Sequence, residues 1–203
     1  MSSASTSQIQ YANEVVRGGY GKIFEGHTVF LTGGTGCLGG CLLYKLALQL
    51  PTSKIFVLVR GNSQQAIEKL RKSMPNHADA ILATNKVEFV IGDMKSVNFG
   101  IETDFLGRLQ DQVTLAIHAA ARIKLESPIR DALESNCLPA LEMARIASEF
   151  RRLKLLIQIS TSYVNTHLPD GPVLERIYHL GGEENPEEEL ASILTLGTSP
   201  HAG

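Results

Sequence analysis

A short apolar run that ends in a cluster of glycines constrains the fold of this chain more than any other feature. Residues 28–40 read TVFLTGGTGCLGG, with Gly33, Gly36 and Gly39 spaced three apart. In a strand–turn–helix unit, the first glycine permits a turn with positive φ, the second lets the backbone approach a pyrophosphate, and the third lets the helix pack close to the strand. The helix N-terminus then offers unpaired N–H groups to phosphate oxygens. The spacing therefore predicts a dinucleotide-binding turn.

Apolar runs alternate with helical patterns along the rest of the chain. Such runs are typical of strands that are buried on both faces of a parallel sheet and joined by crossover helices. The pattern predicts the α/β class, with a Rossmann-type doubly wound parallel sheet flanked by helices. Pro139 lies inside the last expected helix, so we expect a kink or a broken start there. The expected strands are 27–32, 54–59, 86–91, 113–118 and 153–160, and the expected helices are 37–50, 62–74, 103–109 and 128–150.

Length and composition indicate one globular domain. The chain has 203 residues, of which 43% are hydrophobic, and its net charge of −2 argues against nucleic acid as a partner. We expect residues 1–20 to form a flexible lead and residues 21–203 to form the single Rossmann domain. Because no apolar stretch reaches the about 18 residues of a membrane-spanning helix, we expect no transmembrane segment.

The three cysteines, Cys37, Cys41 and Cys137, show no metal-ligand spacing, and we expect no metal site. Cys37 and Cys41 are one helical turn apart, which favours their packing against the sheet. An odd number of cysteines without a secretory signal indicates a reducing compartment, so we expect a cytoplasmic protein.

Charged residues follow the second and third expected strands. Arg60 stands where an NAD-preferring site places an acidic residue. An arginine there can pair with a 2′-phosphate and indicates NADP(H), although a solvated arginine at the strand end would have the same sequence. Asp93 could accept a hydrogen bond from the exocyclic amine of an adenine, and a turn or N-cap aspartate is the alternative.

Small and hydroxyl-bearing residues follow the fourth and fifth expected strands. Ala119, Ala120 and Ala121 would let a dinucleotide pass over the strand end, although close packing of sheet and helix would need the same small residues. We expect the preceding His118 to be packed or hydrogen-bonded rather than to act as a base. Residues 160–165, Ser-Thr-Ser-Tyr-Val-Asn, could hold a substrate carbonyl near a nicotinamide, or they could form a serine/threonine turn.

Together these segments resemble the extended short-chain dehydrogenase/reductase superfamily, and more narrowly the fatty acyl-CoA reductases with their male-sterility-type NAD-binding domain. The resemblance implies a Rossmann domain with a smaller C-terminal substrate-binding part, and NADPH-dependent reduction of an acyl thioester to an aldehyde or an alcohol. Related domains release carrier-bound acyl chains, so the implied substrate is an acyl-CoA or a carrier-bound acyl thioester. The matching segments are TGGTGCLG at 32–39, VLVRG at 57–61, GDM at 92–94, HAAA at 118–121, Asn136, ISTSYVN at 159–165 and ERIY at 175–178.

The resemblance also implies a role for each matching residue. Thr161 would polarise the substrate carbonyl, and Asn136 would support an active-site water or the backbone. Arg60 would meet the 2′-phosphate of NADP(H). The pyrophosphate would lie against Gly33, Thr35, Gly36, Cys37, Leu38 and Gly39, the adenine against Asp93 and Met94, and the nicotinamide ribose against Ala119, Ala120 and Ala121.

Two features depart from the family pattern. The family's active site uses a Tyr-x-x-x-Lys pair, but no lysine lies four residues after any of the five tyrosines, so we expect the chain to end before that segment and before the substrate domain. Cys37 stands where the family usually has phenylalanine. Two alternatives stay open: a non-catalytic NADP(H)-binding protein or truncated relic, and a sugar-nucleotide-type enzyme of the same superfamily, although Arg60 favours the thioester reductases.

Overall fold

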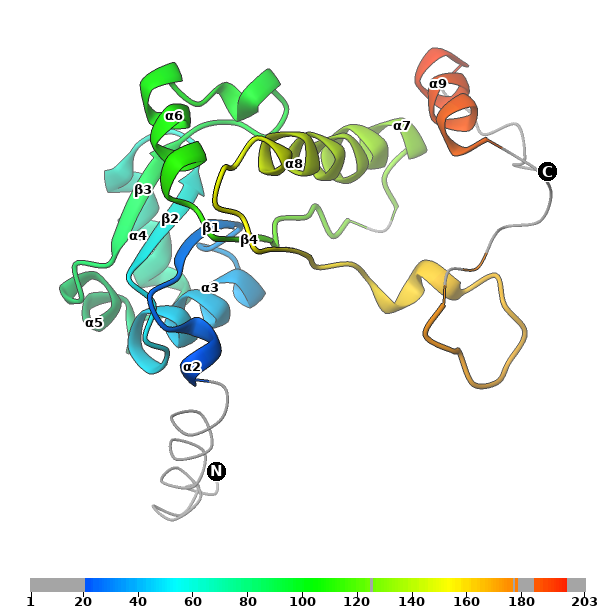
Figure 1. Cartoon of the computed structure of the whole chain (residues 1–203). Helices are drawn as coiled ribbons and strands as arrows, with labels where there is room; N and C mark the ends of the chain where they lie inside the picture. Colours follow the sequence, from blue (N-terminus) through cyan, green and yellow to red (C-terminus); the bar gives the residue numbers. More distant parts are fainter. Residues whose placement is uncertain (1–20, 125, 177, 179–184, 197–203) are drawn as a thin grey trace.

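The centre of the molecule is a sheet of five parallel strands, in the order β3-β2-β1-β4-β5, and Figure 1 labels all of them except β5. The computed structural model describes residues 21–124, 126–176, 178 and 185–196, so the expected lead at 1–20 lies outside the described residues. The order steps outward from β1 to β3 and then resumes with β4 on the other side of β1, which confirms the predicted doubly wound sheet. The strands are β1 (Thr28–Thr32), β2 (Lys54–Val59), β3 (Val87–Ile91), β4 (Leu115–His118) and β5 (Leu155–Gln158).

Helices cover both faces of this sheet. One face carries α3 (Cys37–Tyr44), the π-helical turn η2 (Lys45–Gln49), α4 (Ser63–Ser73) and α5 (Ala78–Ala83). The other face carries α6 (Thr103–Gln112) and α8 (Leu138–Ser148). The remaining helical elements of the described residues are α2 (Gly21–Phe24), η3 (Val97–Gly100), α7 (Ile129–Ala132), η4 (Leu133–Cys137), η5 (Ser162–Asn165) and α9 (Pro186–Leu196).

The central strand β1 is apolar at successive positions because both of its faces are covered. Val29 and Leu31 point into the core under α3 and α4, whereas Phe30 points into the core under α6 and α8. All three side chains are fully buried. Successive side chains of a strand point to opposite faces, and burial of one such side chain contributes about 1.5–3 kcal/mol. The burial of β1 thus anchors the strand that leads into the glycine turn.

The long helix expected at 128–150 forms with a wide turn inside it. Between α7 and α8, the N–H of Leu138 donates to the carbonyl oxygen of Leu133, five residues earlier. Pro139 has no N–H for an α-helical ladder, and its ring crowds the carbonyl group four residues before it. The π-helical turn η4 relieves this conflict, because it ends just before Pro139 enters the first turn of α8. The predicted irregular start is confirmed and takes this form.

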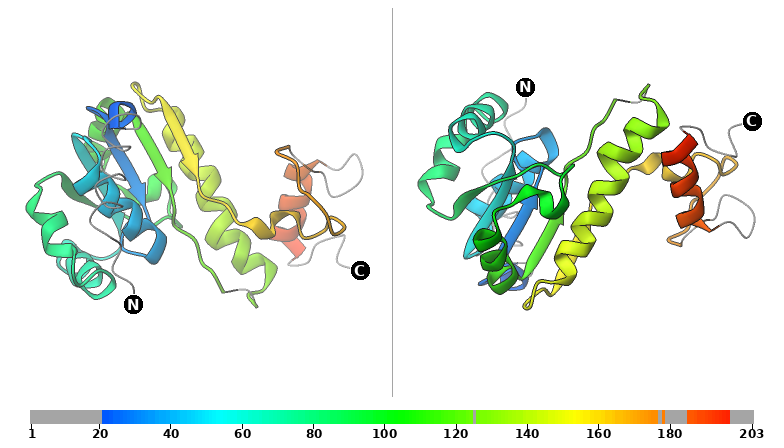
Figure 2. Two further views of the ribbon diagram at one scale, coloured as in Figure 1. Left: turned by 90° about the horizontal axis from the view of Figure 1, so that it is seen from below. Right: turned by 90° about the horizontal axis from the view of Figure 1, so that it is seen from above.

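The strand β5 forms one edge of the sheet and is less covered than the strands beside it. Its first residue, Leu155, is 54% exposed. The strand spans 155–158, shorter than the expected 153–160. Beyond β5 the chain leaves the sheet through η5, and α9 lies beside α7, away from the strands (Figure 2). Within the described part of the chain, no helix is long and apolar enough to cross a membrane.

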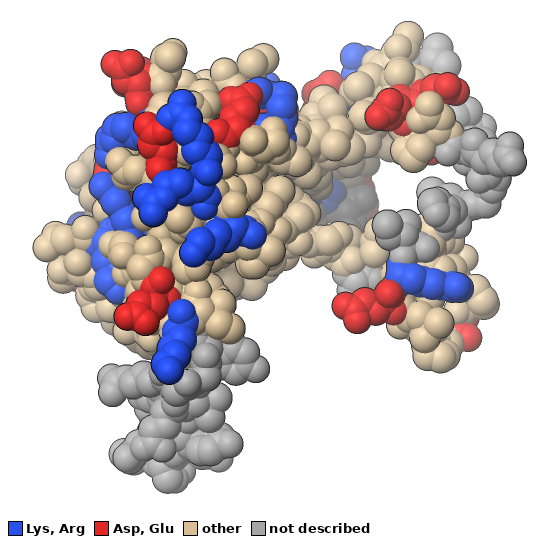
Figure 3. Space-filling model, in the orientation of Figure 1, with Lys and Arg blue, Asp and Glu red and all other residues tan. Residues whose placement is uncertain are grey.

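Basic and acidic side chains lie next to one another over the face shown in Figure 3. Lys54 and Arg108 both pair with Glu88, and Arg71 pairs with Asp79. These groups are partly or largely exposed, so each pair contributes only about 0–1 kcal/mol to stability. The pairs place opposite charges side by side on the surface.

Candidate dinucleotide site

The glycine turn between β1 and α3 contains the close contacts that its spacing predicts. Gly33 has a φ of +75°, and a Cβ added there would lie 2.8 Å from backbone atoms of Ala119 and Ala120. A Cβ added to Gly39 would lie 2.1 Å from the carbonyl oxygen of Gly33. Side-chain carbons do not approach backbone so closely. Gly33 therefore lets β1 turn beside the end of β4, and Gly39 lets α3 pack onto the turn.

The N-terminus of α3 can receive an anion. Gly36 is the N-cap of this helix, and no described side chain caps its first turn. The N–H of Gly36 donates to the carbonyl oxygen of Gly33 at 2.8 Å, which closes the turn. Thr35 is half-buried, and Cys37 and Leu38 are exposed at the turn. The first-turn N–H groups and the positive end of the helix dipole favour a phosphate group here.

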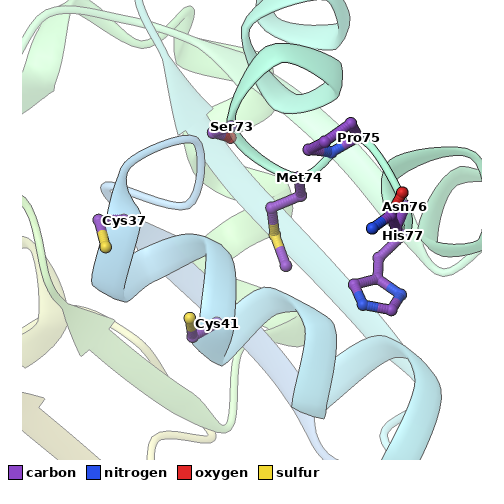
Figure 4. Close-up of a pocket in the computed structure, with 7 residues that line it drawn as sticks. All are labelled: Cys37, Cys41, Ser73, Met74, Pro75, Asn76 and His77. Atoms are coloured by element: carbon purple, nitrogen blue, oxygen red, sulfur yellow. The ribbon is translucent and has the colours of Figure 1, made fainter. Parts of the chain in front are cut away.

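Cys37 and Cys41 do not pack against the sheet, so that prediction is wrong. The helix α3 buries Gly39, Gly40 and Leu43, whereas both cysteines are exposed on another side of the helix. The spacing of four placed the cysteines on one side of the helix but could not say which side. Figure 4 shows them beside a pocket of about 340 Å³, whose other lining residues are Ser73, Met74, Pro75, Asn76 and His77.

Arg60 stands free at the carboxyl end of β2. Its side chain is exposed and makes no hydrogen bond or ion pair within the described residues. Gly61 follows with a φ of +79°, and Asn62 caps α4 by accepting a hydrogen bond from the N–H of Gln65 at 2.9 Å. The chain thus turns into α4 immediately after Arg60. Because β2 pairs directly with β1, Arg60 directly follows the strand beside the one that leads into the glycine turn.

Asp93 belongs to a tight turn that follows β3. Its Oδ1 accepts a hydrogen bond from the N–H of Lys95 at 3.1 Å, and its own N–H donates to the carbonyl oxygen of Phe99 at 2.7 Å. Asp93 is exposed, and its second carboxylate oxygen has no hydrogen-bond partner among the described residues. One oxygen therefore serves the turn, and the other is left for a donor such as an amine. Met94 packs against the core under α6 and α8.

A buried hydrogen-bonded group joins the ends of β1 and β4. The Oγ1 atom of Thr32 lies 2.8 Å from Nδ1 of His118 and also accepts a hydrogen bond from the N–H of Ala120 at 3.3 Å. Burial lowers the pKa of His118, which favours the neutral imidazole. The hydroxyl hydrogen of Thr32 is then free to go to Nδ1. The expectation that His118 is packed and hydrogen-bonded is confirmed, whereas its partner Thr32 was not predicted.

Asn136 holds the segment that follows β4. From η4, its Oδ1 accepts a hydrogen bond from the N–H of Arg122 at 2.8 Å, and its Nδ2 donates to the carbonyl oxygen of Arg122 at 3.0 Å. Both backbone groups of one residue are thus bound by one side chain. In the same segment, Ala119 packs against the core and Ala121 is exposed. The two hydrogen bonds from Asn136 therefore support the backbone of this segment at Arg122.

Thr161 lies just beyond β5, at the start of η5. It is exposed, and its Oγ1 accepts a hydrogen bond from the N–H of Tyr163 at 3.2 Å. This contact is the serine/threonine turn that the sequence left as an alternative. The hydroxyl can still donate its own hydrogen to a carbonyl oxygen. The N–H of Ile159 donates to the carbonyl oxygen of His118 at 2.9 Å, and this bond ties the segment to β4.

The parallel sheet brings these positions to one edge. Asn136 lies in η4 and supports the segment after β4, whereas the other positions lie at or directly after the carboxyl end of a strand, and the strand order reverses between β1 and β4. Open sheets of this kind bind ligands at that reversal, next to the glycine turn. The fold and the turn define a dinucleotide-binding domain of the Rossmann type. Across the described residues, no group of three or more His, Cys, Asp or Glu side chains is placed to hold a metal ion.

Comparison with known families identifies the chain more narrowly. The sequence profile described as male sterility protein, which represents an NAD-binding domain, matches residues 31–199. The chain belongs to this family, which confirms the resemblance drawn from the motifs.

Its relatives include fatty acyl-CoA reductases. A Drosophila melanogaster protein that is assigned by name to these reductases is 31% identical over 162 residues, which cover 77% of this chain and 30% of that protein. Human fatty acyl-CoA reductase 2 is 26% identical over 159 residues, which cover 71% of this chain and 30% of the human protein. The chain therefore spans about 30% of the length of these relatives.

Solved reductase domains share its fold. The crystal structure of the terminal R domain from the myxalamid PKS-NRPS biosynthetic pathway superposes with a TM-score of 0.62 at 28% identity, over 73% of this chain and 37% of that domain. The R domain of a non-ribosomal peptide synthetase from Mycobacterium tuberculosis has a TM-score of 0.58 at 27% identity, over 71% of this chain and 35% of that domain.

Proposed function

We propose that this chain is the NADP(H)-binding part of a reductase that uses NADPH to convert acyl thioesters to aldehydes or alcohols. The observation that carries the proposal is the glycine turn, where a Cβ on Gly33 or Gly39 would collide with backbone and where the neighbouring strand ends in the free Arg60. Membership of an NAD-binding family supports a nicotinamide cofactor. The arginine supports the phosphorylated form, because a guanidinium binds a phosphate through charge-assisted hydrogen bonds.

The residues present fit such a cofactor. The pyrophosphate would be held by the first-turn N–H groups of α3 and flanked by Thr35, Cys37 and Leu38 at the glycine turn. Arg60 would hold the 2′-phosphate. The free oxygen of Asp93, with Met94 beside it, would face the adenine. The cofactor, when bound, supplies a hydride for reduction. On the nicotinamide side we assign the ribose to Ala119, Ala120 and Ala121.

Two further residues have proposed roles in the reaction. Thr161 would donate its hydroxyl hydrogen to the thioester carbonyl and so stabilise the negative charge that develops on its oxygen. Asn136 would keep the segment after β4 in place through Arg122. The net reaction consumes one NADPH and one proton, releases the free thiol, and yields an aldehyde, and a second reduction would give the alcohol.

The proposed substrate is a fatty acyl-CoA, because relatives are fatty acyl-CoA reductases by name. A carrier-bound acyl thioester offers the same carbonyl chemistry. We further propose that the protein acts in the cytoplasm, which the three free cysteines, Cys37, Cys41 and Cys137, support as a reducing compartment.

The oxidation of NADPH by the purified full-length protein with a long-chain acyl-CoA tests the reaction. We expect turnover with the acyl-CoA and a loss of about 10²–10³-fold in kcat for Thr161→Ala, since a donor to the developing oxyanion is removed. Thr166→Ala is the matched control, because Thr166 is an exposed hydroxyl five residues along the same segment whose side chain has no hydrogen-bond partner among the described residues. A protein that binds NADPH but oxidises none of it with any acyl thioester would refute the proposed reaction.

A further inference from the structure

The turn after β3 is closed by an unusual backbone segment. Three consecutive residues have left-handed φ angles: Asn98 at 52°, Phe99 at 53° and Gly100 at 60°. Left-handed backbone suits glycine and is tolerated by asparagine, but it is strained for phenylalanine. A strained residue persists only where its surroundings hold it, and such residues cluster at functional sites.

Phe99 is held from two directions. Its side chain is fully buried in the core under α6 and α8. Its carbonyl oxygen accepts the hydrogen bond from the N–H of Asp93 at 2.7 Å. The same oxygen would lie 2.4 Å from a Cβ on Gly92, so the turn presses directly against the residue before Asp93. The position of Asp93 therefore depends on the conformation of Phe99.

Two side chains of the helix α8 hold the left-handed segment 98–100 through hydrogen bonds to Asn98. Glu142 Oε1 accepts a hydrogen bond from the N–H of Asn98 at 2.6 Å. Arg145 donates to both carboxylate oxygens of Glu142, at 2.7 and 2.8 Å, and also to the side-chain oxygen of Asn98. The carboxylate thus stabilises the N–H at the first left-handed residue. The contact crosses from the layer of helices to the loop at the carboxyl edge of the sheet.

We infer that Glu142 is a positioning residue for the adenine end of the dinucleotide. By fixing Asn98, it fixes the left-handed turn whose carbonyl group at Phe99 holds the N–H of Asp93. The free carboxylate oxygen of Asp93 is then held in a fixed orientation toward the adenine. The inference rests on the proposed function, because it assumes that the nucleotide's adenine lies at Asp93.

Binding of adenosine 2′,5′-bisphosphate and of NADPH, measured by calorimetric titration, tests the inference. We expect Glu142→Ala to weaken both ligands by about the same factor, on the order of tenfold, since one charge-assisted hydrogen bond that positions the shared adenine end is lost. Glu142→Gln keeps a carbonyl oxygen for the N–H of Asn98 and should restore most of the affinity.

Glu149→Ala is the matched control. Glu149 also pairs with Arg145, at 2.7 Å, and also accepts a hydrogen bond from Gln110, but within the described residues it makes no direct contact with the turn and reaches Asn98 only through Arg145. We expect Glu149→Ala to lower the thermal midpoint about as much as Glu142→Ala does and to leave nucleotide affinity unchanged. Hydrogen exchange at the N–H of Asp93 should be faster in Glu142→Ala alone.

The outcomes separate the inference from the proposed function. Binding of both ligands by the unchanged chain, with the same affinity in Glu142→Ala, would overturn the role of Glu142 and leave the cofactor site intact. An equal loss of affinity in Glu149→Ala would also overturn it, because general destabilisation would then explain the effect. Failure of the unchanged chain to bind either ligand would overturn the proposed cofactor site itself, and the inference with it.

Discussion

Thr32 and His118 lie opposite each other on the paired strands β1 and β4, and the buried Oγ1 of Thr32 lies 2.8 Å from Nδ1 of His118. Each is the last residue of its strand. The glycine turn begins directly after Thr32, and the small residues 119–121 begin directly after His118. The hydroxyl of Thr32 also holds the N–H of Ala120. One buried side-chain contact thus sets the spacing between the two segments that the nucleotide would touch.

Replacing Thr32 by valine keeps the shape of the side chain and removes the hydroxyl. Nδ1 of His118 and the N–H of Ala120 would then lack a buried partner, so we expect the free energy of unfolding to fall by about 1–3 kcal/mol. Denaturant titration measures the change. Thr28→Val, on the same strand, is the control, because the Thr28 hydroxyl has no partner in the described structure, and its effect should stay within about 0.5 kcal/mol.

The buried imidazole predicts a dependence of stability on pH. Burial lowers the pKa of His118 in the folded state, so the unfolded chain binds a proton at a higher pH than the folded chain does. The contribution of His118 to the free energy of unfolding is therefore fully present above the unfolded-state pKa of about 6.5. It falls as the pH drops toward the lowered pKa of the folded state. Burial and the nearby charge of Lys154 also lower the pKa of His27, so His27 likewise reduces the stability of the fold as the pH falls.

Denaturant titration between pH 7.5 and 5.5 would detect this effect. We expect His118→Gln to reduce the fall in stability over this range, while His27 keeps a part of it. An identical pH dependence in the unchanged chain and in His118→Gln would contradict the assignment.

The glycine turn predicts opposite outcomes for two substitutions of glycine by alanine. Gly33→Ala places a Cβ where φ is +75° and where backbone lies 2.8 Å away, so we expect a loss of at least about 1–2 kcal/mol in stability. Gly107 lies within α6, with nothing within 4 Å of an added Cβ. Gly107→Ala should therefore raise stability by about 0.5–1 kcal/mol. Thermal unfolding of the two variants measures both effects, and a neutral Gly33→Ala would be the contradictory result.

The hydrogen bonds from Asn136 to Arg122 predict that substitution of Asn136 loosens the backbone locally and does not unfold the whole domain. Asn136→Ala removes both hydrogen bonds to the backbone of Arg122, so exchange of that N–H with solvent should accelerate, by about tenfold or more. Hydrogen–deuterium exchange resolved by residue measures the rate. Asn76→Ala provides the comparison, since Asn76 is exposed and without a partner in the described part of the chain. Equal rates at Arg122 in the two variants would show that Asn136 does not support this segment.

The features that could be predicted from the sequence are those set by local chemistry. Gly33 and Gly39 could be identified because only glycine fits a positive φ or a backbone contact inside the van der Waals limit. The apolar strand at β1 could be identified because both of its faces are covered. Pro139 marked an irregular helix, but the form of the irregularity could not be predicted, because a hydrogen bond between residues five apart has no sequence signal of its own.

The features that could not be predicted depend on which elements become neighbours. The contact of Thr32 with His118 needs β1 beside β4, although a polar residue at the end of each apolar run was a visible signal. The contact of Glu142 with Asn98 needs α8 to pack behind a left-handed turn. The spacing of Cys37 and Cys41 indicates that they share one side of a helix, whereas the side that faces the sheet depends on how α3 packs.

The most direct test of the account is a calorimetric titration of the chain with NADPH and with NADH, repeated for Arg60→Ala. We predict that NADPH binds about 10–100-fold more tightly than NADH, and that Arg60→Ala removes this difference while retaining the affinity for NADH. Arg152→Ala is the matched control, because Arg152 is also exposed and unpaired among the described residues. Arg152 precedes the amino end of β5, whereas Arg60 follows the carboxyl end of β2. Equal binding of the two nucleotides, or an unchanged preference in Arg60→Ala, would contradict the assignment of an NADP(H) site.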